Sequence, residues 1–137
     1  RVVVSYPGTV ISTKAAREVL PVNYSRHHAI QYAGLLSRFV SAMYVQDEAD
    51  ALDSMHDVLA EPYRLSLIPE LLPLRAQMLE QGIVHLGISG SGPTLFAVCT
   101  SDVHAQIAAK IFHAQYEKNT DAMTHICQMA KQGARQL

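Results

Sequence analysis

Short apolar runs, some alternating with polar residues and some continuous, predict the strands of this chain. Runs of this length that end at glycine, proline or polar residues are typical of β-strands. They predict strands over residues 1–6, 83–88, 94–99 and 123–129. In the last run Met123, His125 and Cys127 alternate with the residues between them, which is the period of a strand with two different faces.

Apolar residues at helical spacing predict five helices, over residues 12–20, 27–45, 47–60, 69–81 and 102–117. Ser12 and Ser101 are suited to cap two of them, and Pro21 and Gly82 to end two. Pro73 falls in the first turn of the fourth helix, which leaves its start open. The segment Glu61-Pro62-Tyr63-Arg64 is expected to interrupt the helical pattern, because proline disfavours helix at the residue before it.

The helix over 27–45 carries apolar side chains on more than one face. A helix with this pattern needs more than one neighbour to bury it. The sheet, another helix or a domain outside this chain could be that neighbour. The residues concerned are Ile30, Ala33, Leu35, Leu36, Phe39, Val40 and Met43.

The order of elements is strand, several helices, two strands, helix, strand. This β-α-β-β-α-β order predicts an α+β domain: a ferredoxin-like split β-α-β sandwich, with helices on one face of an antiparallel sheet and extra helices inserted. No repeat or low-complexity linker divides the 137 residues, which suit a single domain, 1–137.

Composition excludes several classes of function. Hydrophobic residues make up 49%, and 11 Lys and Arg balance 12 Asp and Glu, so nothing favours nucleic acid or an anionic membrane. No run is long enough to span a bilayer, and the N-terminus does not resemble a signal peptide. Cys99 and Cys127 fall in apolar segments and are expected to be buried, reduced thiols of a cytoplasmic protein. The seven histidines show no metal-ligand spacing, and the missing initiator Met indicates a fragment or a processed product.

Residues 87–94, Gly-Ile-Ser-Gly-Ser-Gly-Pro-Thr, connect two predicted strands with three glycines. This connection is longer than a tight hairpin turn needs. It suits either a wide hairpin loop or a loop whose backbone packs against a phosphate-binding element, since glycine permits positive φ and close approach. The segment is neither a phosphate-binding loop with its lysine, nor a dinucleotide fingerprint, nor a nucleophile elbow.

Two arginines are candidates for binding a carboxylate or a phosphate. Thr13 and Arg17 lie four residues apart on one face of a predicted helix, and Arg64 follows the proline-induced break. A guanidinium group matches two oxygens of an anion. The alternative is that both arginines are ordinary surface residues, with Arg17 beside Glu18 for example.

Three segments, residues 6–17, 60–64 and 87–94, resemble the C-terminal domain of the homoserine kinases. This family belongs to the superfamily named for galactokinase, homoserine kinase, mevalonate kinase and phosphomevalonate kinase. The glycine-serine segment resembles the third motif of the superfamily, and the Ser-Thr-x-x-Ala-Arg and Glu-Pro-Tyr-Arg segments are similar to homoserine kinase itself. The similarity continues to Gly133-Ala134-Arg135 and covers essentially the whole chain.

The resemblance implies an ATP-dependent kinase that phosphorylates the side-chain hydroxyl of L-homoserine in threonine biosynthesis. It implies that Arg17 and Arg64 bind the substrate carboxylate and that Thr13 lies near the reacting hydroxyl and relays its proton. The loop Ser89, Gly90, Ser91 and Gly92 would pack beside the phosphate loop. ATP and Mg²⁺ would be bound mainly by an N-terminal domain of the same chain, so the fragment alone is expected to be inactive.

Other functions stay open at this stage. Another kinase of the superfamily that acts on a small carboxylate would also use an arginine pair. A non-catalytic amino-acid-binding or dimerisation module could use the same fold. The apolar helix over 27–45 would suit a partner surface, including that of a homodimer.

Overall fold

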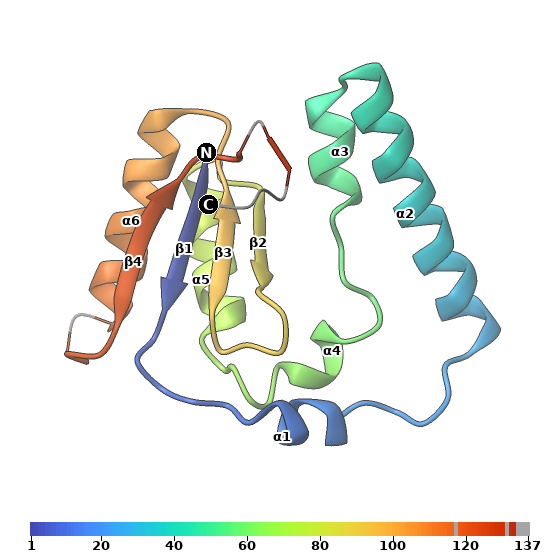
Figure 1. The fold of residues 1–137 in the computed structure, drawn as a ribbon, viewed down its shortest axis with the longest axis horizontal. Helices are drawn as coiled ribbons and strands as arrows, with labels where there is room; N and C mark the ends of the chain where they lie inside the picture. The colour runs from blue at the N-terminus through green and yellow to red at the C-terminus, as the bar shows by residue number, and fades with distance from the viewer. Residues whose placement is uncertain (117, 131, 134–137) are drawn as a thin grey trace.

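The computed structural model describes residues 1–116, 118–130, 132 and 133. Glu117, the expected end of the last helix, and the Ala134-Arg135 part of the C-terminal similarity lie outside these residues. Figure 1 shows the elements, which in chain order are β1 (Val2–Tyr6), α1 (Thr13–Glu18), α2 (Arg26–Val45), α3 (Glu48–Ser54), α4 (Glu61–Arg64), α5 (Leu71–Glu80), β2 (His85–Ile88), β3 (Leu95–Val98), α6 (Asp102–Tyr116) and β4 (Met123–Cys127).

The four strands form one antiparallel sheet in the order β2-β3-β1-β4. Both pairings of β1 are fixed in register, with Val4 opposite Phe96 on one side and His125 on the other. Helices α5 and α6 lie along the same face of the sheet (Figure 1). The predicted α+β architecture, a ferredoxin-like split β-α-β sandwich with inserted helices, is therefore confirmed.

The core lies between the sheet and these two helices. Strand β1 turns Val3 and Ser5 inward, and β3 does the same with Leu95 and Ala97. Ser5 is the polar member of this layer, and its hydroxyl makes a hydrogen bond of 2.9 Å with that of Thr124. The helices contribute Leu71, Leu74, Met78, Ala105, Ala108 and Phe112 to the core.

Helices α2 and α3 form a hairpin that stands beside the sheet (Figure 1). Arg38 joins the two helices through ion pairs with Asp50 and Asp53. Among the described residues, the element that packs against α2 is another helix, α3. Most of the apolar side chains of α2 stay exposed, including Leu36 at 49% and Met43 at 53%. The described chain therefore leaves much of the apolar surface of α2 uncovered.

The expectation that 47–60 forms one helix is wrong in its second half. Helix α3 ends at Ser54, and the Asp57 carboxylate accepts hydrogen bonds from the backbone N–H groups of Leu59, Ala60 and Glu61. These bonds start α4, so residues 61–64 form a helical turn and not the break that proline suggested. The proline stands in the first turn, where its missing N–H costs nothing.

The ends of the other elements are close to their expected positions. The side chains of Ser12 and Ser101 accept the cap hydrogen bonds predicted for them. Gly82 follows α5 at φ +75°, and α5 begins at Leu71, two residues later than expected. The last strand ends at Cys127 instead of residue 129.

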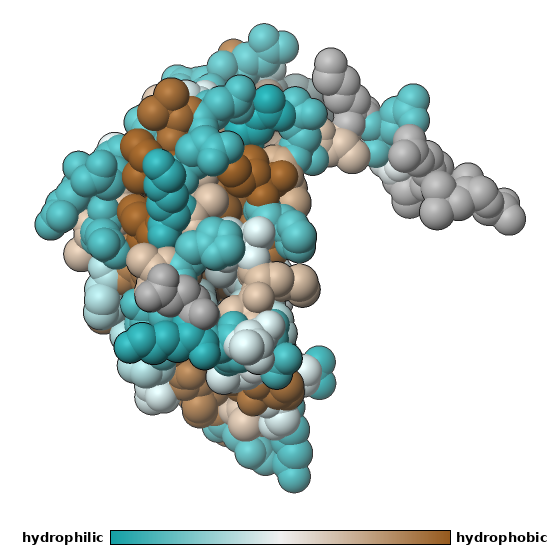
Figure 2. Space-filling view, turned by 90° about the vertical axis from the view of Figure 1, so that its left-hand side faces the viewer, coloured by the Kyte–Doolittle hydropathy of each residue, from teal (hydrophilic) through white to brown (hydrophobic). Residues whose placement is uncertain are grey.

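Strand β4 is at the edge of the sheet, and its side chains are mostly exposed. Cys99 is buried as expected, but Cys127 is exposed, so the expectation of two buried thiols is wrong for Cys127. Figure 2 views the α6 and β4 side, where hydrophilic surface separates the apolar patches. None of the described helices combines the length and apolarity that crossing a membrane requires.

Candidate functional site

Helix α1 presents Thr13 and Arg17 to solvent. The Ser12 hydroxyl accepts a hydrogen bond of 3.0 Å from Ala15 N and fixes the start of the helix, so the two residues lie one turn apart on the same face. Glu18 pairs with Lys14 at 3.8 Å and not with Arg17. Within the described part of the chain Arg17 forms no ion pair, which leaves its charge available to an anion.

Arg64 points from α4 toward two other segments of the chain. Its Nε donates to the carbonyl oxygen of Ala16 in α1 at 3.2 Å. Its Nη1 donates to the carbonyl oxygen of Gly90 at 2.9 Å. No residue that the structure describes accepts a hydrogen bond from Nη2. Arg64 is therefore held by backbone groups and still has donors for a ligand.

The glycine-serine loop connects β2 and β3. A hydrogen bond of 2.8 Å from Ser89 N to Thr94 O closes it, and Gly92 N donates to Ser89 O at 3.1 Å. Gly90 and Gly92 both have positive φ, +62° and +79°. A Cβ at Gly92 would lie 2.7 Å from Ile68 Cδ1, whereas one at Gly90 would meet nothing within 4 Å. Gly92 therefore packs against the interior, whereas the backbone of Gly90 faces open space.

The structure brings α1, α4 and the loop together at Arg64. The bonds of Arg64 span 48 positions to Ala16 and 26 positions to Gly90. Of the predicted site residues, Thr13, Arg17, Ser89 and Gly90 are exposed, and Arg64, Ser91 and Gly92 are half-buried. The candidate site is thus one open surface, with cationic side chains next to exposed loop backbone.

Sequence reasoning missed two supports of this surface. Asp57 caps α4, and its spacing ahead of Glu61 is a signal that could have been used. The second support is an ion pair in which Arg75 binds both carboxylate oxygens of Glu61 at 2.8 Å. Nothing local in the sequence relates these two residues, because they meet only when α4 and α5 pack beside β2.

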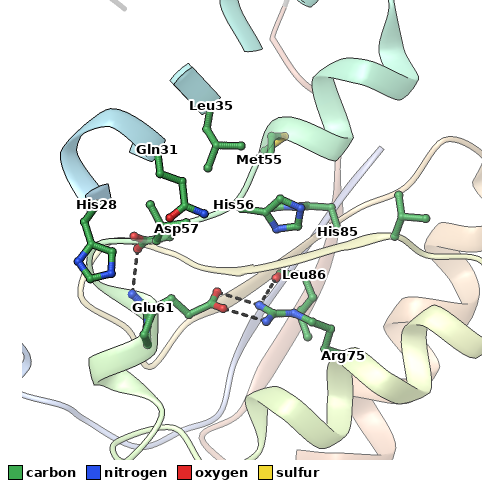
Figure 3. Close-up of a pocket in the computed structure, with 13 residues that line it drawn as sticks. His28, Gln31, Leu35, Met55, His56, Asp57, Glu61, Arg75, His85 and Leu86 are labelled. Atoms are coloured by element: carbon green, nitrogen blue, oxygen red, sulfur yellow. Dashed lines mark hydrogen bonds and ion pairs between the residues drawn. The ribbon is translucent and has the colours of Figure 1, made fainter. Parts of the chain in front are cut away.

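A separate cavity of about 460 Å³ lies between the α2–α3 hairpin and β2. His28 and His56 from the hairpin side, His85 from β2 and the Glu61–Arg75 pair line it (Figure 3). Burial lowers the pKa of His85 to about 4; the charges of His56 and Arg75 act in the same direction, and Glu61 opposes them. Among the described residues, no group of three or more histidine, cysteine or acidic side chains is placed to hold a metal ion.

The surface around Arg64 can bind and orient an anion. Guanidinium groups and exposed N–H groups favour carboxylate or phosphate oxygens. A phosphoryl-transfer site needs mainly this kind of positioning and charge stabilisation. A second wall would be required to exclude water from so open a surface.

Comparisons with known proteins show the family to which this fold belongs. The chain is similar to the crystal structure of homoserine kinase from Cytophaga hutchinsonii, with a TM-score of 0.82 and 27% sequence identity. The match covers 90% of this chain and 40% of that kinase, so the chain spans less than half of the kinase's length. A family model described as GHMP kinases C terminal, from the superfamily of galactokinase and homoserine kinase, matches residues 39–118. Because this model matches more than half of the sequence and the fold agrees, this chain belongs to the C-terminal domain family of the GHMP kinases.

Proposed function

We propose that this chain is the substrate-side domain of an ATP-dependent homoserine kinase, which phosphorylates the side-chain hydroxyl of L-homoserine in threonine biosynthesis. The observation that carries the proposal is the position of Arg64, which joins α1 to the glycine-serine loop. Both arginine-bearing segments then lie beside the loop that resembles the third motif of the superfamily. The likeness to the Cytophaga hutchinsonii homoserine kinase supports the choice of substrate.

Arg64 and Arg17 are the residues that we assign to the α-carboxylate of L-homoserine. The carbonyl groups of Ala16 and Gly90 hold Arg64 in a fixed orientation, and its Nη2 is left to donate to the ligand. Arg17 lies one residue after Ala16 on the same helix and forms no ion pair among the described residues. Two guanidinium groups suit the two oxygens of a carboxylate.

Thr13 is assigned to the reacting hydroxyl. Thr13 lies one helical turn before Arg17. If Arg17 binds the carboxylate of the substrate, Thr13 is on the side where the hydroxyl end of the substrate would lie. A threonine hydroxyl is a poor base, so its role is to accept the substrate proton in a hydrogen bond and relay it. The gain in rate is expected at or below the lower end of the usual 10²- to 10⁴-fold range for proton transfer by a side chain.

ATP and Mg²⁺ belong to the other wall of the cleft in this proposal. Members of the superfamily use ATP, and this chain has no phosphate-cradling loop of its own. We assign ATP and Mg²⁺ to an N-terminal domain of the same polypeptide, which would pack against the exposed backbone of Gly90. The exposed apolar side chains of α2 would face that domain or, in a homodimer, a second subunit.

The test is Arg64→Ala in the full-length protein, assayed by ADP release. Arg64→Ala leaves the desolvated carboxylate of the substrate without its partner. This loss is expected to weaken homoserine binding by on the order of 2–5 kcal/mol, with little change in the KM for ATP. Arg38→Ala, which removes the ion pairs with Asp50 and Asp53 within the α2–α3 hairpin, is the matched control. A homoserine KM within twofold of the parent value would contradict the assignment of Arg64.

The same assay separates the other candidate functions. Turnover with mevalonate or another small carboxylate, and none with homoserine, would identify a different kinase of the superfamily. Binding of an amino acid in calorimetry without ATP turnover in the full-length protein would indicate a sensing or dimerisation module.

A further inference from the structure

Glu61 and Arg75 form an ion pair that links three elements of the domain. Arg75 donates to both carboxylate oxygens of Glu61 at 2.8 Å, and its Nη2 also donates to the carbonyl oxygen of Leu86 at 2.8 Å (Figure 3). The pair thereby connects α4, α5 and β2. The Glu61 side chain is only 16% exposed and that of Arg75 35%, so solvent weakens their attraction less than at an open surface.

Arg64 is anchored along the same stretch of chain. Leu86 lies in β2, and Gly90, which accepts from Arg64 Nη1, lies in the loop that follows β2. Helix α4 has only four residues, too few for its own hydrogen bonds to fix its direction. The Glu61–Arg75 pair and the Arg64–Gly90 bond therefore tie α4 to α5, to β2 and to the loop that follows β2.

Glu61 is also the carboxylate closest to Arg64 in sequence. Oppositely charged residues three positions apart on a helix are neighbours and attract each other. In the structure Glu61 pairs with Arg75 instead, while Arg64 bonds to the carbonyl groups of Ala16 and Gly90. Arg75 thus binds the carboxylate that is nearest to Arg64 in sequence and that could otherwise pair with it.

We infer that Arg75 is a positioning residue for Arg64: by binding Glu61 on both oxygens, it ties α4 to α5 and β2 and keeps the Glu61 carboxylate away from the guanidinium group that meets the substrate. The identity of the substrate rests on the proposed function. The arrangement of Glu61, Arg64 and Arg75 rests on their contacts alone.

The kinetic test compares Arg75→Met, Glu61→Gln and the double variant in the full-length protein. Arg75→Met keeps the unbranched apolar stem of the side chain but removes the guanidinium group and so releases Glu61. The homoserine KM is expected to rise about tenfold with the KM for ATP within twofold. Glu61→Gln leaves no competing carboxylate and should raise the homoserine KM only about threefold. The double variant should bind homoserine better than Arg75→Met does, because the released group at position 61 is no longer charged.

A purely structural ion pair gives the opposite order. In that case the double variant is at least as impaired as Arg75→Met, and this result would overturn the inference.

The effect must also pass through Arg64, so Arg75→Met should add less than twofold to the homoserine KM of an Arg64→Ala protein. Arg38→Met, which removes the ion pairs with Asp50 and Asp53 within the α2–α3 hairpin, should leave the homoserine KM unchanged. If Arg75→Met does not fold, Arg75→Lys, which keeps the charge but only part of the pairing, should show a smaller rise with the same rescue by Glu61→Gln.

A second readout needs no substrate. The Nε–H of Arg64 donates to Ala16 O, so its NMR signal, identified by its loss in Arg64→Lys, should exchange slowly with water. Arg75→Met should speed this exchange at least tenfold, and Glu61→Gln in the same protein should partly restore it. Unchanged exchange in Arg75→Met would overturn the inference. Normal NMR behaviour in a protein that does not phosphorylate homoserine would overturn the proposed function and leave the positioning role supported.

Discussion

At the scale of single residues, the candidate site depends on which atoms are already used within the chain. Arg64 has two backbone partners, whereas Arg17 and Thr13 are exposed on α1. Groups already held in place lose little freedom when a ligand binds, whereas an exposed side chain must be ordered. Arg64 is therefore expected to contribute more to substrate affinity than Arg17.

Substitutions on α1 should separate binding from chemistry. Arg17→Ala is expected to raise the homoserine KM with a smaller effect on kcat, because it removes a contact with the substrate carboxylate in the ground state and the transition state alike. Thr13→Val keeps the shape and removes the hydroxyl, so it should mainly lower kcat. Steady-state kinetics of the full-length protein measure both. An unchanged kcat in Thr13→Val would leave Thr13 as a helix-start residue only.

At the scale of elements, two glycines of one hairpin loop face different surroundings. Gly92 packs on Ile68, and a Cβ there would lie 2.7 Å from its Cδ1. Gly90 has open space at the same position, although both have positive φ. The loop therefore has an inward glycine required by packing and an outward glycine next to the candidate site.

Substitutions at these two glycines should affect different properties. Gly92→Ala is expected to lower the free energy of unfolding by about 2–3 kcal/mol, since it adds a steric clash to the strain of positive φ. Gly90→Val should cost about 1–2 kcal/mol for the backbone strain and still abolish turnover, because its side chain fills the space that the other wall of the cleft must approach. Denaturant unfolding and the kinase assay together measure these effects. Near-normal turnover of folded Gly90→Val would mean that the loop is only a connector.

At the scale of the whole molecule, the buried imidazole of His85 links the stability of the domain to pH. His85 is 7% exposed on β2, next to the ring of Phe96 at a centroid distance of 5.5 Å. Its pKa of about 4 in the folded state is below the ordinary value of 6.5, chiefly because burial disfavours the charged form. The unfolded chain therefore binds the proton first as pH falls, which favours unfolding.

Stability should fall as the pH decreases from about 6.5 toward 4. Between pH 7 and pH 5 the His85 contribution to the free energy of unfolding is expected to decrease by about 2 kcal/mol. Urea unfolding of the parent and of His85→Gln at both pH values isolates this contribution from that of the carboxylates. An equal loss of stability in the two proteins would show that His85 is not responsible.

In the proposed function this domain supplies one wall of a cleft, so activity should depend on an N-terminal domain as well. Residues 1–137 alone are expected to show no homoserine-dependent ATP turnover, because the sequence has no loop that could cradle ATP. The full-length protein provides the positive control in the same coupled assay. Turnover by residues 1–137 at a rate near that of the full-length protein would refute the division of labour proposed here.

The sequence by itself determined the strands, the helix caps at Ser12 and Ser101, the end of α5 at Gly82 and the order of elements that predicts the sheet. These features are local, since side-chain period, capping and positive φ each depend on a few neighbouring residues. Residue types and spacing made Arg17, Arg64 and the glycine-serine loop candidates, and the resemblance to a family implied their roles. Their roles in binding and chemistry are still predictions.

Only the tertiary structure decided what these residues contact. The pair that joins Glu61 to Arg75 and the bonds of Arg64 to Ala16 and Gly90 all connect segments far apart in sequence. Exposure of Cys127 depends on β4 lying at the sheet edge, and exposure of α2 on the elements packed against it. A local pattern cannot encode such facts, because they arise from which distant surfaces the folded chain brings into contact.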